Sequence, residues 1–151
     1  MCRQHGFTLI ELLIVVAILG ILALVAFMAI NPAKRQNQAK DARTKADIDQ
    51  IATGLGVYFT THQPQTYPVD LSEVVNNKDL KSLPTPPNSG TYGSGYAAVA
   101  EDGGTCDGGT IVCSRAKLSW TLNDPQNGNS VWCWQSSTGK AQPLTPVLCT
   151  P

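Results

Sequence analysis

The chain has 151 residues, enough for one domain or for a small globular head with an appendage. Eleven basic residues balance eleven acidic residues, so no global charge favours nucleic acid or an acidic membrane surface as the main partner. Charged residues make up 15% of the chain, below the usual quarter. Part of that deficit comes from residues 7–30, where Glu11 is the only formal charge.

Motifs for catalysis are also lacking. After the first six residues the only histidine is His62, and the sequence contains no Gly-x-Ser-x-Gly motif, nucleotide-binding P-loop or zinc motif. We therefore expect no enzyme, and we predict no catalytic residue, cofactor or metal site.

Residues 7–30 form the most apolar segment, in which only Thr8, Glu11 and Gly20 are not strongly apolar. As a helix this segment spans roughly 36 Å, enough for a hydrocarbon core of about 30 Å. The run is too long for the apolar part of a cleaved secretory signal peptide. A simple membrane anchor explains the length but not Glu11, because a carboxylate in such a helix costs on the order of 2–3 kcal/mol near the membrane centre and less near an end.

A specific motif opens this segment: a short leader with Arg3, followed by Gly6-Phe7-Thr8-Leu9-Ile10-Glu11. Together with the apolar run, it resembles the N-terminus of the type IV pilin and pseudopilin family. The resemblance implies that a membrane aspartyl peptidase cuts between Gly6 and Phe7 and methylates the new Phe7 amine. It also gives Glu11 a partner, because the carboxylate can pair with the Phe7 amine of a neighbouring subunit in a filament. A pair within one chain is the alternative.

The resemblance further implies an α+β fold, in which a long N-terminal α-helix packs on a small antiparallel sheet with disulfide-stapled loops. Residues 1–6 are expected to be a leader peptide, and residues 7–30 the half of the helix that lies in the membrane or the filament core. Residues 31–60 are then the amphipathic half of the helix, and residues 61–151 a globular head.

The function implied by the resemblance is that of a structural subunit of a type IV pilus. The precursor would be a single-pass membrane protein, and the mature chain would lie in an extracellular pilus on the cell surface. Its expected partners are further copies in a helical homo-oligomer, the prepilin peptidase, the pilus assembly machinery and the membrane. The alternatives are a pseudopilin of a type II secretion or competence system, and a minor pilin that acts as an adhesin or a DNA-binding tip protein.

Two positions bear on the course of the helix. Gly20 weakens it by about 1 kcal/mol relative to alanine, which suits the loosening that helices of this family undergo on assembly. The family often has a proline near position 28, where this chain has Met28. The first proline is Pro32, after Asn31, so a kink is predicted near residue 32.

The second half of the helix has an apolar stripe at helical spacing, which we predict to pack on the sheet. The stripe comprises Ile48, Ile51, Ala52, Leu55, Tyr58 and Phe59. Before it, only small apolar residues occur, at Ala39, Ala42 and Ala46. The charged side chains around them offer two candidate ion pairs, Asp41 with Lys45 and Arg43 with Asp47. This face is either solvated or packed against neighbouring subunits.

The head is predicted to contain a short helix over residues 71–83, ended by Pro84, and three strands at about 92–100, 110–122 and 130–136. In the second strand apolar and polar residues alternate, which indicates one face buried against the helix and one wet face. A turn at residues 123–129 joins the second strand to the third. The pattern predicts an antiparallel meander packed on the helix.

Five cysteines are present, and four of them remain if the first six residues are removed: Cys106, Cys113, Cys133 and Cys149. Their clustering predicts disulfides rather than zinc ligands, and hence an oxidising compartment. If residues 122 and 130 close the hairpin, Cys133 lies opposite Ser119, roughly 20 Å from Cys113, too far for a bridge.

The preferred pairing is Cys106–Cys113 with Cys133–Cys149. The second of these bridges would enclose a loop that resembles the disulfide-bounded C-terminal region of many pilins. The pairing of Cys106 with Cys133 and of Cys113 with Cys149 is the alternative.

Three features bear on the specific role. The segment Pro86-Pro87-Asn88-Ser89-Gly90 stands where major pseudopilins usually have an acidic-Pro-Trp-Gly stretch, which favours a pilus subunit. Residues 101–109 are acidic and Gly-rich, so calcium binding is an alternative to a flexible surface loop, although their spacing does not match an EF-hand. A weak candidate for nucleic-acid binding consists of two basic residues near two tryptophans: Arg115, Lys117, Trp132 and Trp134. The two tryptophans are, however, favoured as core residues.

Overall fold

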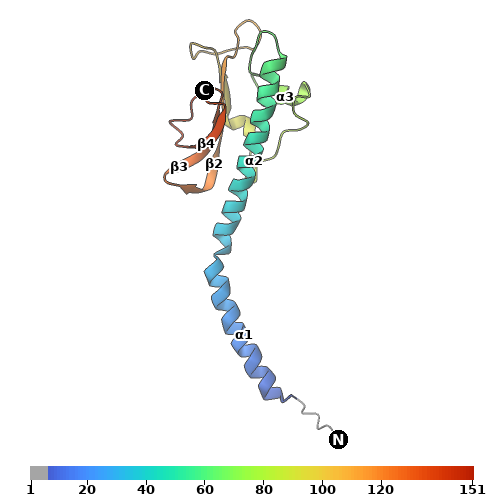
Figure 1. The fold of residues 1–151 in the computed structure, drawn as a ribbon, viewed down its shortest axis with the longest axis vertical. Helices are drawn as coiled ribbons and strands as arrows, with labels where there is room; N and C mark the ends of the chain where they lie inside the picture. The colour runs from blue at the N-terminus through green and yellow to red at the C-terminus, as the bar shows by residue number, and fades with distance from the viewer. Residues whose placement is uncertain (1–6) are drawn as a thin grey trace. The chain divides into compact units, whose positions relative to one another are not determined.

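The computed structural model describes residues 7–151. The chain divides into two compact units, one that ends at Gln36 and one that comprises Asn37–Pro151. Figure 1 shows the helices and the sheet. The elements in chain order are α1 (Leu9–Ile30), α2 (Pro32–Thr61), α3 (Leu71–Asn76), the 3₁₀ helix η1 (Tyr92–Gly95), β1 (Tyr96–Val99), β2 (Arg115–Gln126), β3 (Asn129–Gln135) and β4 (Lys140–Leu144).

The kink predicted near residue 32 is a break between two helices. Asn31 ends α1 in the left-handed conformation, with φ of 44°. Its side-chain Oδ1 accepts a hydrogen bond from the Lys34 N–H at 3.3 Å, and its carbonyl oxygen accepts one from the Arg35 N–H at 3.3 Å. Pro32 is the first residue of α2, where a missing N–H costs nothing. Asn31 and Pro32 together end one helix and begin the next.

The apolar stripe of α2 forms the core of the second unit, as predicted. Ile48, Ile51 and Leu55 are fully buried and Tyr58 is 6% exposed. The stripe packs against α3 and the inner face of the sheet, where Ala116 and Leu118 of β2 are fully buried and Trp134 of β3 is 5% exposed. In Figure 1 the labelled α2 runs alongside the strands.

The sheet is an antiparallel meander in the order β1-β2-β3-β4, which confirms the predicted topology. Ser119 pairs with Cys133, the register expected from the sequence. The hairpin continues further than predicted and turns at Asn127-Gly128, both with positive φ. This turn chemistry suits a two-residue hairpin loop.

The predicted bounds of other elements were partly wrong. The first predicted strand begins as η1, and the second starts at Arg115 rather than at residue 110. The helix predicted over residues 71–83 ends at Asn76, because Asn77 caps α3 and Lys78 takes a φ of 66°. The edge strand β4 was not predicted, since it contains Pro143, which only an edge strand accommodates.

The polar start of the buried stripe on α2 was also missed. Asp41 and Thr44 are buried at 5% and 0% exposure, and they continue the stripe toward the N-terminus of α2. The small apolar residues at 39, 42 and 46 lie on the exposed side instead. The predicted Arg43–Asp47 pair forms, at 3.8 Å. Asp41 does not pair with Lys45, because its carboxylate faces the sheet.

The carboxylate of Asp41 binds the irregular part of the β2–β3 hairpin. The strand register shifts between Thr121 and Gln126, as in a β-bulge, which takes backbone groups out of the ladder. Asp41 Oδ1 accepts hydrogen bonds from the Asn123 N–H at 2.7 Å and from Asn123 Nδ2 at 2.8 Å, and Oδ2 accepts one from the Asp124 N–H at 2.9 Å. We call this arrangement the Asp41 latch.

The outer face of the sheet was predicted to be wet, but the C-terminal segment partly covers it. Lys117 Nζ donates to the Cys149 carbonyl oxygen at 3.0 Å, and Gln135 Nε2 donates to the carbonyl oxygens of Leu148 and Thr150 at 3.1 and 2.8 Å. The Cys133–Cys149 bridge holds this segment against β3, with Cys133 fully buried.

Candidate functional site

The first turn of α1 holds the candidate site residues that fall within the described part of the chain. Thr8 is the N-cap, with extended backbone angles, and its Oγ1 accepts a hydrogen bond from the Glu11 N–H at 3.3 Å. Glu11 Oε2 in return accepts from the Thr8 N–H at 3.3 Å and from the Thr8 hydroxyl at 3.2 Å. This reciprocal capping box fixes the carboxylate over the start of the helix. Gly6, the other residue of the predicted cleavage junction, lies outside the described residues.

The position of Glu11 at the N-terminal end of α1 is electrostatically favourable. A carboxylate there interacts with the positive end of the helix dipole and with N–H groups that lack partners within the helix. Glu11 is the only acidic side chain in the first turn of α1. It lies within one turn of Phe7, whose side chain is 82% exposed. The structure therefore places Phe7 and Glu11 at the same end of α1.

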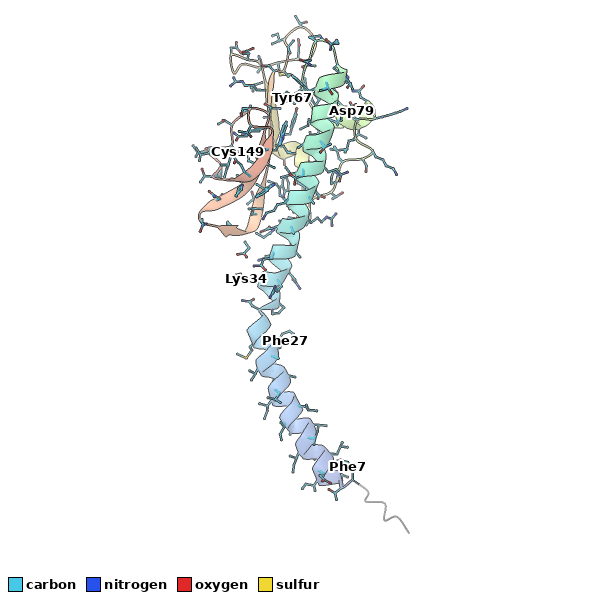
Figure 2. The ribbon with its side chains drawn as sticks, viewed as in Figure 1. Phe7, Phe27, Lys34, Tyr67, Asp79 and Cys149 are labelled. Atoms are coloured by element: carbon cyan, nitrogen blue, oxygen red, sulfur yellow. A yellow bond between two sulfur atoms is a disulfide. The ribbon has the colours of Figure 1, made fainter. Side chains whose placement is uncertain are left out.

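The rest of α1 presents apolar side chains outward. The segment Leu9–Met28 is long and apolar enough to cross a membrane, by length and composition. Its large hydrophobic side chains are exposed by 46% at Val15 and by up to 82% at Leu9. Figure 2 shows them projecting from the helix between Phe7 and Phe27. Gly20 has open space where a Cβ would stand. Such an apolar surface is typical of a segment covered by lipid or by other helices.

The cysteines of the head are joined in two disulfides, Cys106–Cys113 and Cys133–Cys149. This is the pairing preferred from the sequence. The first bridge closes a short loop before β2, and the second ties the C-terminal segment to β3. Among residues 7–151, no group of three or more His, Cys, Asp or Glu side chains is arranged to hold a metal ion.

In the acidic loop before β2, the carboxylates of Asp102 and Asp107 accept hydrogen bonds within the loop itself. Asp102 Oδ1 accepts a hydrogen bond from the Gly104 N–H at 2.8 Å. Asp107 Oδ1 accepts from the N–H groups of Ile111 and Gly109 at 2.7 and 2.9 Å, and these backbone bonds lower the pKa of Asp107. The geometry is that of Asx turns, which organise a surface loop.

The basic and aromatic residues considered for nucleic-acid binding do not lie together. Trp134 pairs across the strands with Leu118, on the face toward α2, whereas Lys117 pairs with Gln135 on the opposite face. Lys45 of α2 lies over the Trp132 ring, 4.8 Å from its centroid. Arg115 donates to the Glu101 carbonyl oxygen at 2.8 Å. The two basic side chains and the two tryptophans therefore do not form one surface, and Trp134 lies in the core, as favoured from the sequence.

Three tyrosine hydroxyls form hydrogen bonds between separate elements of the second unit. Burial and a 2.9 Å hydrogen bond to Glu73 raise the pKa of Tyr58 from 10.0 to about 12. Burial raises the pKa of Tyr92, which donates to Asp47 at 2.9 Å, and that of Tyr96, which donates to the Pro68 carbonyl oxygen at 2.7 Å. These bonds are structural ties rather than a reactive centre.

Comparison with known proteins identifies the N-terminal motif. Residues 1–27 match the family model for the prokaryotic N-terminal methylation motif. No solved structure matches the chain significantly.

Three curated relatives extend this result. The fimbrial protein of Dichelobacter nodosus is 37% identical over 102 residues, which is 67% of this chain and 62% of that protein. The type II secretion system core protein G of Pseudomonas aeruginosa is 48% identical over 56 residues, 37% of this chain and 38% of that protein. The type IV major pilin protein PilA of Myxococcus xanthus is 43% identical over 58 residues, 38% of this chain and 26% of that protein. The chain thus spans less than two thirds of each of these relatives.

Proposed function

Because this chain belongs to the type IV pilin and pseudopilin family, we propose that it is the precursor of a structural subunit of a type IV pilus. Members of this family are structural proteins rather than enzymes. In this proposal the chain is cut between Gly6 and Phe7, and the new Phe7 amine is methylated. The mature subunits then polymerise through their α1 helices.

The observation that carries the proposal is an apolar helix with one carboxylate fixed in its first turn. Cleavage before Phe7 would create a positive amine at the same end of α1 as Glu11. In a filament the amine of one copy would meet the Glu11 carboxylate of the next, which neutralises two charges among apolar helices. Removal of one partner from such a buried pair costs about 3–5 kcal/mol, because the other charge is left unpaired.

The route to the filament follows from the same helix. Before cleavage, α1 would anchor the precursor in the membrane, with residues 1–6 on the cytoplasmic side and the head outside. The peptidase and the assembly machinery would then move the chain from the membrane into an extracellular filament. The oxidised cysteines of the head support its exposure to an oxidising compartment.

A secretion pseudopilin is the second candidate, supported by the 48% identity to the core protein G over 56 residues. The pilus subunit is favoured because the alignment with the fimbrial protein covers 102 residues and so extends into the head. The Pro86-Pro87-Asn88 segment, which replaces the acidic-Pro-Trp-Gly stretch of major pseudopilins, supports the same choice.

Mass spectrometry of filaments sheared from the cell surface tests the proposal. We expect this chain as a main component, with methylated Phe7 as its first residue. A chain that stays in the membrane fraction with an intact Gly6–Phe7 bond would contradict the proposed processing. Filaments that contain the chain only under conditions of protein secretion would instead favour the pseudopilin.

Two variants separate the charge of Glu11 from its capping role. Glu11→Gln keeps the size of the side chain and a residue that a capping box accepts, but it removes the charge. Thr8→Ala removes the cap hydroxyl and keeps the charge. We expect Glu11→Gln to be cut normally yet to form few or no filaments, and Thr8→Ala to assemble. The reverse pattern would show that the cap, rather than the charge pair, supports assembly.

A further inference from the structure

A pocket follows the edge of β2 beyond the N-terminal end of β1. β1 pairs only with Arg115–Leu118, and η1 then lies beside Ser119. The contact is so close that a Cβ on Gly95 would overlap the Ser119 carbonyl oxygen. Past this contact, β2 borders a pocket of about 450 Å³. Because β1 begins only at Tyr96, opposite Leu118, the edge of β2 beyond Leu118 is accessible to a small molecule.

The lining of this pocket is polar but uncharged. Within the described part of the chain, none of the residues that line it is Asp, Glu, Lys, Arg or His. Leu122 and Val131 contribute apolar surface. The polar lining consists of two amides, three hydroxyls and one indole, from Asn88, Asn123, Ser94, Ser119, Thr121 and Trp120.

Several polar side chains of the lining are held by hydrogen bonds within the protein. Asn123 Oδ1 accepts from Asn88 Nδ2 at 2.9 Å, while Asn123 Nδ2 donates to Asp41 Oδ1 at 2.8 Å. The Ser94 hydroxyl donates to the Thr91 carbonyl oxygen at 2.8 Å. Because a hydroxyl has one proton and two lone pairs, Ser94 can only accept from a ligand. The pocket therefore suits a ligand that donates hydrogen bonds.

The indole of Trp120 is half-buried and fixed. The Tyr92 ring meets it edge-on, with centroids 5.1 Å apart and an interplanar angle of 65°. Gly90 passes close to its rim, since a Cβ at Gly90 would lie 3.1 Å from Trp120 Cη2. A rigid indole beside hydroxyl and amide groups offers an apolar surface and polar partners to the same ligand.

We propose that this pocket binds a neutral sugar. A pyranose ring has an apolar face of C–H groups that can lie on an indole, and hydroxyls that can donate to Ser94 and to the amide oxygens. An ionic ligand would find no opposite charge in the lining. A purely apolar ligand would leave the remaining acceptor sites of Ser94 and of the amide oxygens without a partner, which is costly. This binding activity goes beyond the proposed role of the chain as a filament subunit.

NMR titration of the full chain, in a zwitterionic detergent that contains no sugar, tests the proposal. The probes are the methyl glycosides of glucose, galactose, mannose and N-acetylglucosamine, each added separately, with N-acetylneuraminic acid as the anionic control. We expect at least one neutral glycoside to shift the indole N–H signal of Trp120 with a Kd of about 1–10 mM, the range of a few weak contacts. The anionic sugar should not shift it.

Two matched threonine variants locate the binding site. Thr121 is exposed at the pocket, so Thr121→Arg fills the pocket with little risk to the fold. Thr53 is also exposed but lies on α2, away from this pocket, so Thr53→Arg is the control. We expect Thr121→Arg to raise the Kd at least about tenfold, equivalent to 1.4 kcal/mol, and Thr53→Arg to leave it unchanged.

Several results would overturn the proposal. One is the absence of a Trp120 shift with all four glycosides up to about 50 mM, well above the expected Kd. Equal shifts with the anionic sugar would contradict selectivity for a neutral ligand, and equal effects of the two threonine variants would place the binding elsewhere. A change of the Trp120 environment when filaments assemble without sugar would assign the pocket to a second copy of the chain.

Discussion

The apolar helix α1 and the head differ in where their apolar side chains are buried. Along Leu9–Met28 the large hydrophobic side chains are all at least 46% exposed, whereas Ile48, Ile51 and Leu55 of α2 are fully buried in the core shared with the head. The head is further tied by two disulfides and the Asp41 latch. A single chain thus contains one region that stabilises itself and another that needs lipid or other helices. Substitutions should therefore act differently in the two regions.

Replacing glycine by alanine once in the head and once in α1 should give the largest difference in stability between the two regions. We expect Gly95→Ala to destabilise the head by about 4 kcal/mol, because the new Cβ would overlap the Ser119 carbonyl oxygen. Gly20→Ala meets open space and should stabilise the isolated helix by about 1 kcal/mol. All three tryptophans lie in the head, so denaturant unfolding followed by tryptophan fluorescence reports on the head alone. A Gly95→Ala variant with an unchanged midpoint would refute the close contact.

Removal of the disulfides should cause the next largest loss in the free energy of unfolding of the head. The Cys133–Cys149 bridge joins residues 16 apart and the Cys106–Cys113 bridge residues 7 apart. Loop-closure entropy predicts losses of about 3 and about 2 kcal/mol when each pair is replaced by serine. Urea unfolding of the two double variants measures this order, while the helical circular dichroism of α1 in detergent should not change. A larger loss for the shorter loop would show that packing, rather than loop closure, dominates.

The Asp41 latch should contribute somewhat less than the disulfides to the free energy of unfolding of the head. Asp41→Ala leaves the N–H groups of Asn123 and Asp124 without the carboxylate that accepts from them, so we expect a loss of about 2 kcal/mol. Faster amide hydrogen exchange at these two residues should accompany it. Asp49→Ala, at an exposed position of the same helix, is the control and should stay within about 0.5 kcal/mol. Equal effects of the two variants would contradict the latch.

The smallest expected effect concerns alkaline pH. The pKa of Tyr58 is raised from 10.0 to about 12, so above pH 10 the unfolded chain loses this proton before the folded chain does. Its stabilising contribution is complete below pH 10 and is lost as the pH rises through 12. In urea unfolding at several pH values, Tyr58→Phe should therefore reduce the fall in the free energy of unfolding between pH 10 and pH 12. Tyr92 and Tyr96 also have raised pKa values, so part of the fall should remain.

The sequence was informative where periodicity and chemistry agree. Ile48, Ile51 and Leu55 follow the helical stripe and lie in the core. The register of Ser119 with Cys133 was predicted although the predicted turn was too long, because the bulge lies beyond this pair. The sequence could not reveal that the stripe continues through Asp41. An aspartate can be buried only if N–H groups donate to it, and those of Asn123 and Asp124 lie far from Asp41 in the chain.

Other misses have local causes. The helix predicted over residues 71–83 has the right apolar spacing, but its end depends on the left-handed conformation of Lys78. Within the candidate site, the motif predicted Phe7 and Glu11 but not the hydrogen bonds of the capping box. The pocket beside Trp120 could not be predicted from the sequence, because it depends on where along β2 the pairing with β1 begins.

The capping box of α1 has a consequence for the number of bonds that Glu11 can make. Among the described residues, Thr8 donates both of its hydrogen bonds to Oε2. An ionised carboxylate has about four lone-pair sites on its two oxygens. A neighbouring amine could therefore bind at Oε1 while the cap stays intact. Formation of the proposed filament contact would not require the first turn of α1 to unwind. The Glu11 side chain could thus stabilise the start of its own helix and bind a second subunit at the same time.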